Sequence, residues 1–207
     1  MIDAGPLESL RLTLLGVGAM NSPRYAPAGL LVECRASRVM IDGGGTAVPA
    51  GRIAAWLVTD ERSELIREIR TQARALGVLP HVGPFSQRGI VIEPRPVVHT
   101  SHPTFGYQIA AGERMVVWAP EFLEWPEWAS HADLMFAEAA GWRRQIRFAH
   151  GTGGHAAALD VAADAIRSGV RRLVFAHIGR PTIRALDRGE SPPFGEMGHD
   201  RDTFELI

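Results

Sequence analysis

The sequence contains no lysine, since all 22 of its positively charged residues are arginines. A chain without lysine cannot form a Schiff base, use a lysine general base or build a phosphate loop of the Walker type. The arginines are offset by 23 acidic residues, which leaves a formal net charge of −1. This balance gives no general reason to expect nucleic-acid binding, although Arg143, Arg144 and Arg147 could form a local basic patch.

Cysteine and long apolar runs are also scarce. The single cysteine, Cys34, excludes an internal disulfide framework and is expected to be a small core residue in a reducing compartment. No run of about 18 apolar residues is present, so we expect no membrane span. The first ten residues are acidic and are interrupted by Gly5 and Pro6, unlike a signal peptide. These absences together predict a cytoplasmic protein.

What is present is typical of a globular protein, with 46% hydrophobic and 22% charged residues. The length of 207 residues predicts one domain over residues 1–207. Short apolar runs separated by turn residues predict strands at residues 10–17, 28–34, 38–41, 52–58, 89–93, 95–100, 106–110, 114–118, 134–138, 172–177 and 203–207. Apolar residues at helical spacing, each series followed by glycine, predict helices at residues 61–76 and 156–168.

The order of these elements is several strands, a helix, several strands, a helix and a strand. This order fits neither a doubly wound parallel sheet nor an all-β sandwich. It predicts an α/β fold in which two mixed β-sheets pack face to face with helices outside, an αββα sandwich. Loops at one edge of such a sandwich can converge on a site, and the sequence leaves open whether residues 191–202 form a lid over it.

Residues 57–66 read Leu-Val-Thr-Asp-Glu-Arg-Ser-Glu-Leu-Ile. This segment resembles the metal-binding segment of the metallo-β-lactamase-fold hydrolases, in which His-x-His-x-Asp-His follows an apolar strand and a threonine and precedes a helix. The motif is degenerate in this chain, because its four ligand positions hold Asp60, Arg62, Glu64 and Leu65.

Other segments resemble the same superfamily in the same order, and particularly its phosphodiesterase branch, which includes ribonuclease Z and a cyclic phosphodiesterase of phosphonate breakdown. The glycine turn after the first strand and the Ile-Asp-Gly-Gly sequence after the third are similar to two signatures of that branch. The remaining similar segments are 96–100 with His99, 116–121 with Glu121, 153–155 with His155 and 172–177 with His177.

The resemblance implies a metal site, which takes seven protein ligands when two zinc ions are bound. Arg62 is a permanent cation and Leu65 is apolar, so neither can bind a metal. Glu121 would stand where the superfamily has a bridging aspartate, and His155 would be an additional active-site histidine. The positions that still offer a ligand atom are Asp60, Glu64, His99, Glu121 and His177.

Several of these residues also have ordinary structural explanations. Asp60 is a favoured N-cap for the predicted helix at 61–76, and Glu64 suits the positive end of that helix. His99 and His102 are three residues apart, so in an extended segment they would point to opposite faces, and we expect only His99 to face the site. His102 is then a turn residue before Pro103.

Aromatic and acidic residues near the ends of the predicted strands are similarly ambiguous. Glu138 follows an apolar run, as Glu121 does, and a carboxylate at the end of a strand commonly lies at the rim. Four tryptophans could line an apolar pocket, pack in the core or form an oligomer interface such as that of a homodimer. These are Trp118, Trp125, Trp128 and Trp142.

Two functions are compatible with the sequence. The first is metal-dependent hydrolysis of a phosphodiester or another small ester at an altered centre with one zinc, manganese or iron ion. In it, His155 protonates the leaving group and Arg62 binds an anionic substrate. The second is a non-catalytic relative without metal, in which a salt-bridge network centred on Arg62 fills the site and the protein binds a small anion or a protein partner.

Overall fold

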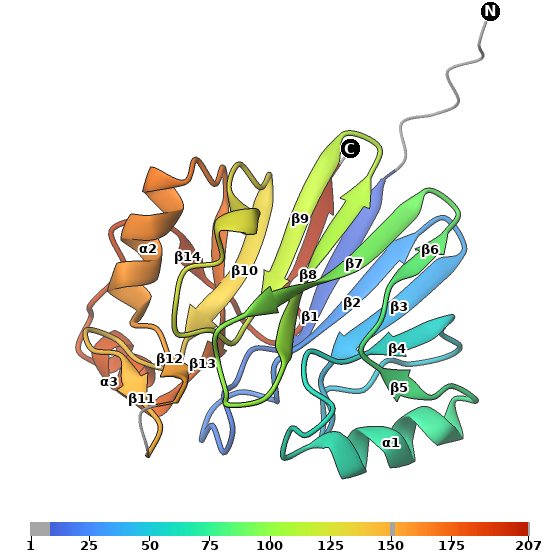
Figure 1. Ribbon diagram of the computed structural model, residues 1–207, viewed down its shortest axis with the longest axis horizontal. Helices are drawn as coiled ribbons and strands as arrows, with labels where there is room; N and C mark the ends of the chain where they lie inside the picture. The colour runs from blue at the N-terminus through green and yellow to red at the C-terminus, as the bar shows by residue number, and fades with distance from the viewer. Residues whose placement is uncertain (1–8, 150–151, 207) are drawn as a thin grey trace, which may run out of the picture.

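Two mixed β-sheets pack face to face in the computed structural model, which describes residues 9–149 and 152–206 (Figure 1). The first sheet has the order β15-β1-β2-β3-β4-β5, with β1 at Leu10–Gly16, β2 at Gly29–Cys34, β3 at Ser37–Asp42, β4 at Ala55–Leu57, β5 at Pro80–His81 and β15 at Thr203–Leu206. The second has the order β14-β13-β10-β9-β8-β7-β6, with β6 at Phe85–Gln87, β7 at Ile90–Val97, β8 at Thr104–Ala111, β9 at Arg114–Ala119, β10 at Leu134–Ala139, β13 at Leu173–Ile178 and β14 at Glu196–Met197.

The helices lie outside the two sheets. They are α1 at Ile66–Ala75, α2 at Ala158–Arg167 and α3 at Arg180–Asp187, with a short 3-10 helix at Glu127–Ala129 and a small hairpin of β11 at Ile146–Arg147 and β12 at Gly154–His155. Figure 1 shows α1 next to β5 at one end of the molecule and α2 and α3 beyond β13 at the other. The predicted αββα sandwich is therefore confirmed. Within the described residues, no helix combines the length and apolar character needed to cross a membrane.

Strand periodicity separates the two faces of the first sheet. In β2, Leu30 and Val32 belong to the core between the sheets, whereas Leu31 points to the outer face. On that outer face Leu31 belongs to a second cluster that contains Ile69 of α1. Cys34 is buried in the main core, as predicted. Alternation with a period of two thus places one apolar set between the sheets and another beneath a helix.

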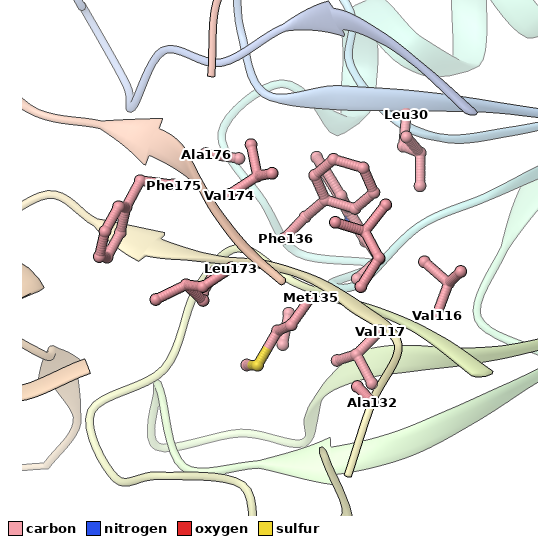
Figure 2. Packing of buried hydrophobic residues seen from close by; sticks show 14 of the residues in the cluster. Leu30, Val116, Val117, Ala132, Met135, Phe136, Leu173, Val174, Phe175 and Ala176 are labelled. Atoms are coloured by element: carbon pink, nitrogen blue, oxygen red, sulfur yellow. The ribbon is translucent and has the colours of Figure 1, made fainter. Parts of the chain in front are cut away.

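Figure 2 shows the same alternation in the second sheet. Phe136 of β10 and Val174 of β13 lie on the side that faces Leu30, and Met135 and Leu173 lie on the other side. All five side chains are at most 1% exposed. The second sheet is therefore buried on both faces here, which explains the continuous apolar runs of β10 and β13.

Most predicted elements are confirmed, although the short strands β5, β6, β11, β12 and β14 were not predicted. Three further differences concern longer elements. The strands expected at 89–93 and 95–100 are one strand, β7. Its prolines at 94 and 96 lie beyond the part paired with β6, where β7 is the edge of the sheet, and an edge strand tolerates proline. Helix α1 begins at Ile66, five residues later than predicted. Helix α3, with Pro181 in its first turn, was not predicted, because the glycines and prolines around it suggested irregular structure. Strand β15 matches the prediction, and Ile207 lies outside the described residues.

Asp42 ties the two sheets together at the end of β3. Its Oδ1 accepts hydrogen bonds from the Thr59 amide (2.7 Å) and the Thr59 hydroxyl (2.9 Å), and its Oδ2 accepts one from Trp118 Nε1 of the second sheet (2.7 Å). The chain then turns sharply at Gly43, whose φ is +84°, and a Cβ there would lie 2.5 Å from the Ala47 carbonyl oxygen. Burial is the largest influence on Asp42 and raises the pKa of its carboxyl group to about 6.

The raised pKa of Asp42 predicts a pH-dependent contribution to stability. The pKa rises from 3.8 to about 6, so the folded protein binds a proton more tightly than the unfolded chain, and stability falls as the pH rises through this interval. Relative to Asp42→Asn, the wild-type free energy of unfolding should fall by roughly 2 kcal/mol between pH 4 and pH 7, at 1.36 kcal/mol per pKa unit. Urea titrations at several pH values measure this. Asp160→Asn, at an exposed position, is the control, and parallel profiles for wild type and Asp42→Asn would contradict the assignment.

Candidate functional site

A cleft of about 700 Å³ opens where loops from both sheets meet. It is lined by residues that follow β1, β3, β4, β7, β9, β10 and β13, and by residues of the β11–β12 hairpin. The loop edge of the sandwich therefore carries the site, as expected. All seven candidate residues predicted from the sequence line this cleft: Asp60, Arg62, Glu64, His99, Glu121, His155 and His177.

Two histidines converge on the carboxylate of Glu121. His99 Nε2 lies 2.9 Å from Glu121 Oε2, and His177 Nε2 lies 2.9 Å from Glu121 Oε1. The opposite nitrogen of each ring is also bonded: His99 Nδ1 lies 2.9 Å from the Gly154 carbonyl oxygen, and His177 Nδ1 lies 3.0 Å from Glu138 Oε1. Both histidines are buried, whereas the Glu121 side chain is 32% exposed to the cleft.

The charges in this group are strongly coupled. Burial alone would lower the pKa of His177, but the carboxylates of Glu121 and Glu138 outweigh it and raise that pKa well above its ordinary value. Burial alone would raise the pKa of Glu121, but His177 and His99 hold it well below its ordinary value. Without a metal ion, His177 is therefore an imidazolium that lies between two carboxylates.

Glu138 accepts hydrogen bonds from four residues around the site. The expectation that it lies at the rim is wrong. Its side chain is fully buried, and its pKa stays below the ordinary value because His155 and His177 outweigh the effect of burial. His155 Nδ1 lies 2.7 Å from Oε2, and the backbone amides of Phe122 and Ala140 donate to Oε2 and Oε1 at 3.2 and 2.8 Å. The apolar run before Glu138 did indicate the right strand end. What the sequence did not show is that two histidines from other elements meet there.

Within the described part of the chain, Glu138, His155 and His177 form a group with the spacing needed for a metal ion, because one ligand atom from each lies within 4.8 Å of the others. The ring of His155 stacks on that of His177, with centroids 5.1 Å apart and an interplanar angle of 28°. The structure therefore contains a potential metal site among residues that line the cleft or lie directly behind it.

Asp60 is not a helix cap. The N-cap position of α1 is Leu65, and Asp60 instead accepts a hydrogen bond from the Arg62 amide (2.7 Å). Its carboxylate also contacts His102, whose Nε2 lies 3.0 and 2.9 Å from the two Asp60 oxygens. The expectation that His102 faces away is wrong, because the chain bends after β7 instead of continuing extended and both His99 and His102 line the cleft.

The salt-bridge network predicted around Arg62 is not formed. Arg62 and Glu64 are both exposed, and the Arg62 guanidinium has no ion pair with any described residue. The carboxylates it was expected to neutralise are matched elsewhere, Asp60 by His102 and Glu121 by His99 and His177. Contacts with histidine therefore take the place of the contacts that the second functional hypothesis assigned to Arg62.

One side of the cleft is apolar. Ile146 and Phe148 are each 36% exposed, and the Phe148 ring packs edge-on against His99 and His155 with centroids 5.4 and 5.3 Å away. The four tryptophans considered as pocket walls do not line the cleft. Trp118 and Trp142 are buried in the core, and Trp125 and Trp128 pack against it.

Residues 191–202 do not cover the cleft, because none of them lines it. The segment is fixed to the sandwich, with the Gly198 amide donating to the Phe175 carbonyl oxygen (2.9 Å) and Asp200 accepting from the amides of Val17 and Ala26 (3.1 and 2.8 Å). This segment is therefore part of the scaffold in the structure.

Comparison with known proteins identifies the fold. No family model and no curated protein matches the sequence. Among solved structures, the chain is similar to the metallo-β-lactamase-fold protein YhfI of Bacillus subtilis (14% identity, 96% of this chain and 100% of that one, TM-score 0.74). It is also similar to a diphosphatase of the PhnP family (17%, 96% and 97%, 0.70) and to Zn²⁺-bound PqqB of Methylobacterium extorquens (13%, 95% and 100%, 0.69).

The protein therefore has the metallo-β-lactamase fold, and the resemblance drawn from its sequence segments is confirmed at the level of the fold. Its structural neighbours include hydrolases and a zinc-bound protein of that fold. At sequence identities of 13–17%, these similarities establish the fold of the chain but not a particular activity.

Removal of the Glu138 carboxylate should strongly destabilise the protein. Glu138→Ala leaves His155, His177 and two backbone amides without their acceptor in a fully buried place, and breaking one partner of a buried charged network costs about 3–5 kcal/mol. Urea unfolding at pH 7 measures the change. Glu205→Ala, which removes an exposed carboxylate paired with Arg11, should have little effect, and equal losses for the two variants would contradict the role of Glu138.

Proposed function

We propose that this protein is a hydrolase that uses one divalent metal ion to cleave a phosphodiester or another small ester of an anionic substrate. The observation that carries the proposal is the pairing of His99 and His177. Both direct Nε2 at Glu121, and both have Nδ1 bonded to an acceptor behind the site. Histidines that bind metals in proteins have this arrangement, because a bond at one nitrogen fixes the orientation of the other.

The donor set fits a single ion. Two imidazoles and one carboxylate form a set of three protein ligands, as in catalytic zinc sites that keep a position open, and manganese and iron accept similar sets. An ion held by His99, Glu121 and His177 would replace the two protons that now lie between the histidines and Glu121. Metal uptake should therefore release protons and strengthen as the pH rises.

A second ion does not fit the degenerate motif. Arg62 and Leu65 offer no ligand, Glu64 is exposed, and Asp60 is engaged by His102. The inner group of Glu138, His155 and His177 is a weaker candidate than the Nε2 set. Glu138 already accepts four hydrogen bonds at full burial, and a metal there would displace some of them.

His155 is suited to protonate the leaving group. Glu138 accepts a hydrogen bond from its Nδ1, which leaves Nε2 without a partner in the described part of the chain, on a ring that lines the cleft. A carboxylate fixes the orientation of a histidine in this way in many general acids and bases. When bound, the metal ion would supply Lewis-acid activation of the scissile group and of a water molecule.

The rim of the cleft favours an anionic substrate with an apolar part. Arg62 and Arg180 place two guanidinium groups at the cleft, and neither forms an ion pair with a described residue. Arginine binds phosphate and carboxylate oxygens through two parallel hydrogen bonds. Ile146 and Phe148 provide an exposed apolar surface for the remainder of the substrate.

Loss of a ligand should abolish both metal binding and hydrolysis. The purified protein should take up about one equivalent of zinc or manganese per chain and hydrolyse bis(4-nitrophenyl) phosphate, whereas His177→Ala should do neither. Elemental analysis and initial rates measure the two properties. His81→Ala removes an exposed histidine outside the cleft and should behave as wild type. A wild-type protein that binds no metal and is inactive would instead support a non-catalytic relative.

Loss of the Arg62 guanidinium should weaken substrate binding without loss of the metal. Arg62→Gln should raise KM about tenfold, the effect of losing about 1.4 kcal/mol of interaction with an anion, and should leave kcat and metal content nearly unchanged. Arg67→Gln alters an exposed arginine of α1 that does not line the cleft and serves as the control. An unchanged KM in Arg62→Gln would contradict anion recognition by this residue.

A further inference from the structure

Two histidines of the cleft that do not contact Glu121 are each paired with a buried carboxylate. The first pair is His155 with Glu138, and the second is His102 with Asp60. The carboxylates are 0% and 7% exposed, and both histidine rings line the cleft. The first pair is the general acid of the proposed function, and nothing in that function uses the second pair.

The contact with Asp60 determines which nitrogen of His102 is available. Nε2 lies 3.0 and 2.9 Å from the two oxygens of Asp60, and a carboxylate only accepts hydrogen bonds, so Nε2 carries the hydrogen. In the neutral ring, Nδ1 then holds a lone pair. It has no hydrogen-bond partner among residues 9–149 and 152–206.

Asp60 is itself held firmly, so it can orient the ring. Its Oδ1 accepts the Arg62 amide at 2.7 Å, and the side chain is nearly inaccessible. Thr100 fixes the loop that carries the histidine, because its hydroxyl donates to the His102 carbonyl oxygen at 2.9 Å. The ring of His102, by contrast, keeps 24% of its surface exposed at the cleft.

We propose that His102, oriented by Asp60, is the general base that removes a proton from the attacking water. The proposal rests on the proposed hydrolysis. A site with one ion has less positive charge to acidify water than a site with two, and a positioned base contributes typically 10²–10⁴-fold to such a step. Asp60 stands at the first position of the degenerate motif, and in this proposal it acts on the reaction through His102.

The reaction balances with the groups present. The water oxygen forms a bond to the phosphorus or carbonyl carbon while its proton passes to His102 Nδ1. The bond from that atom to the leaving oxygen breaks, and the leaving oxygen takes the Nε2 proton of His155, which must enter this step as the imidazolium with its Nδ1 hydrogen on Glu138. Proton exchange with solvent then restores both histidines, and the net reaction is the addition of one water to the ester.

The test is the variant His102→Gln. The glutamine amide keeps an N–H that can donate to Asp60, so the buried carboxylate keeps its hydrogen bond and the fold should be retained. Glutamine cannot, however, accept a proton at the position of Nδ1. With bis(4-nitrophenyl) phosphate, kcat should fall 10²–10⁴-fold while KM and the metal content stay close to wild type. His81→Gln is the matched control. Added imidazole should restore part of the rate to His102→Gly, which leaves a space for it, and should not affect His102→Gln.

Asp60→Asn separates positioning from proton transfer. It should lower kcat less than His102→Gln does, and the double variant should be no slower than His102→Gln alone, because the two residues act as a unit. An active wild type with unchanged kcat in His102→Gln would overturn the base and leave the hydrolase intact. Loss of metal from His102→Gln would identify His102 as a ligand and also overturn it. An inactive, metal-free wild type would overturn the hydrolase and the base together.

Discussion

The site depends on one fully buried carboxylate, that of Glu138. A charge without solvent is tolerated only when it is paired and hydrogen-bonded, and Glu138 satisfies this with two backbone amides and two histidines. Its partners come from the loop after β9, the end of β10, β12 and β13. These segments must therefore meet in one arrangement. Because His155 and His177 contact Glu138 through Nδ1, the Nε2 atoms of both rings are directed away from Glu138.

Asp42 has a similar role in the other half of the molecule. It joins β3 to the residue after β4 and, through Trp118, to the second sheet. The two carboxylates differ in their partners, however. Asp42 is surrounded by neutral donors and its pKa rises, whereas Glu138 has histidines beside it and its pKa falls. The carboxylate with neutral donors joins the two sheets, and the carboxylate with histidines fixes the position of two imidazoles at the cleft.

The fold was predictable from the sequence because it depends on the periodicity of apolar residues. Alternation in the strands and helical spacing in α1 and α2 can both be recognised in the sequence alone. The order of the segments also predicted that the candidate residues, such as His99, Glu121 and His177, would lie together at one cleft. Their partners were not predictable. Glu138 meets His155 and His177 across gaps of 17 and 39 residues, and Asp60 meets His102 across 42. Such contacts depend on how loops bend, as after β7, and no local pattern encodes that.

The exposure of Arg62 follows from the same charge balance. Asp60 and Glu121 line the cleft, and Glu138 lies buried behind it. An arginine would be drawn inward if these carboxylates lacked partners, because an unpaired buried charge is costly. Histidine contacts reach each of the three, so no uncompensated carboxylate remains to hold the guanidinium. The Arg62 guanidinium therefore stays at the rim and forms no ion pair with residues 9–149 or 152–206. The arrangement therefore has histidines against its inner carboxylates and the exposed Arg62 side chain at its rim.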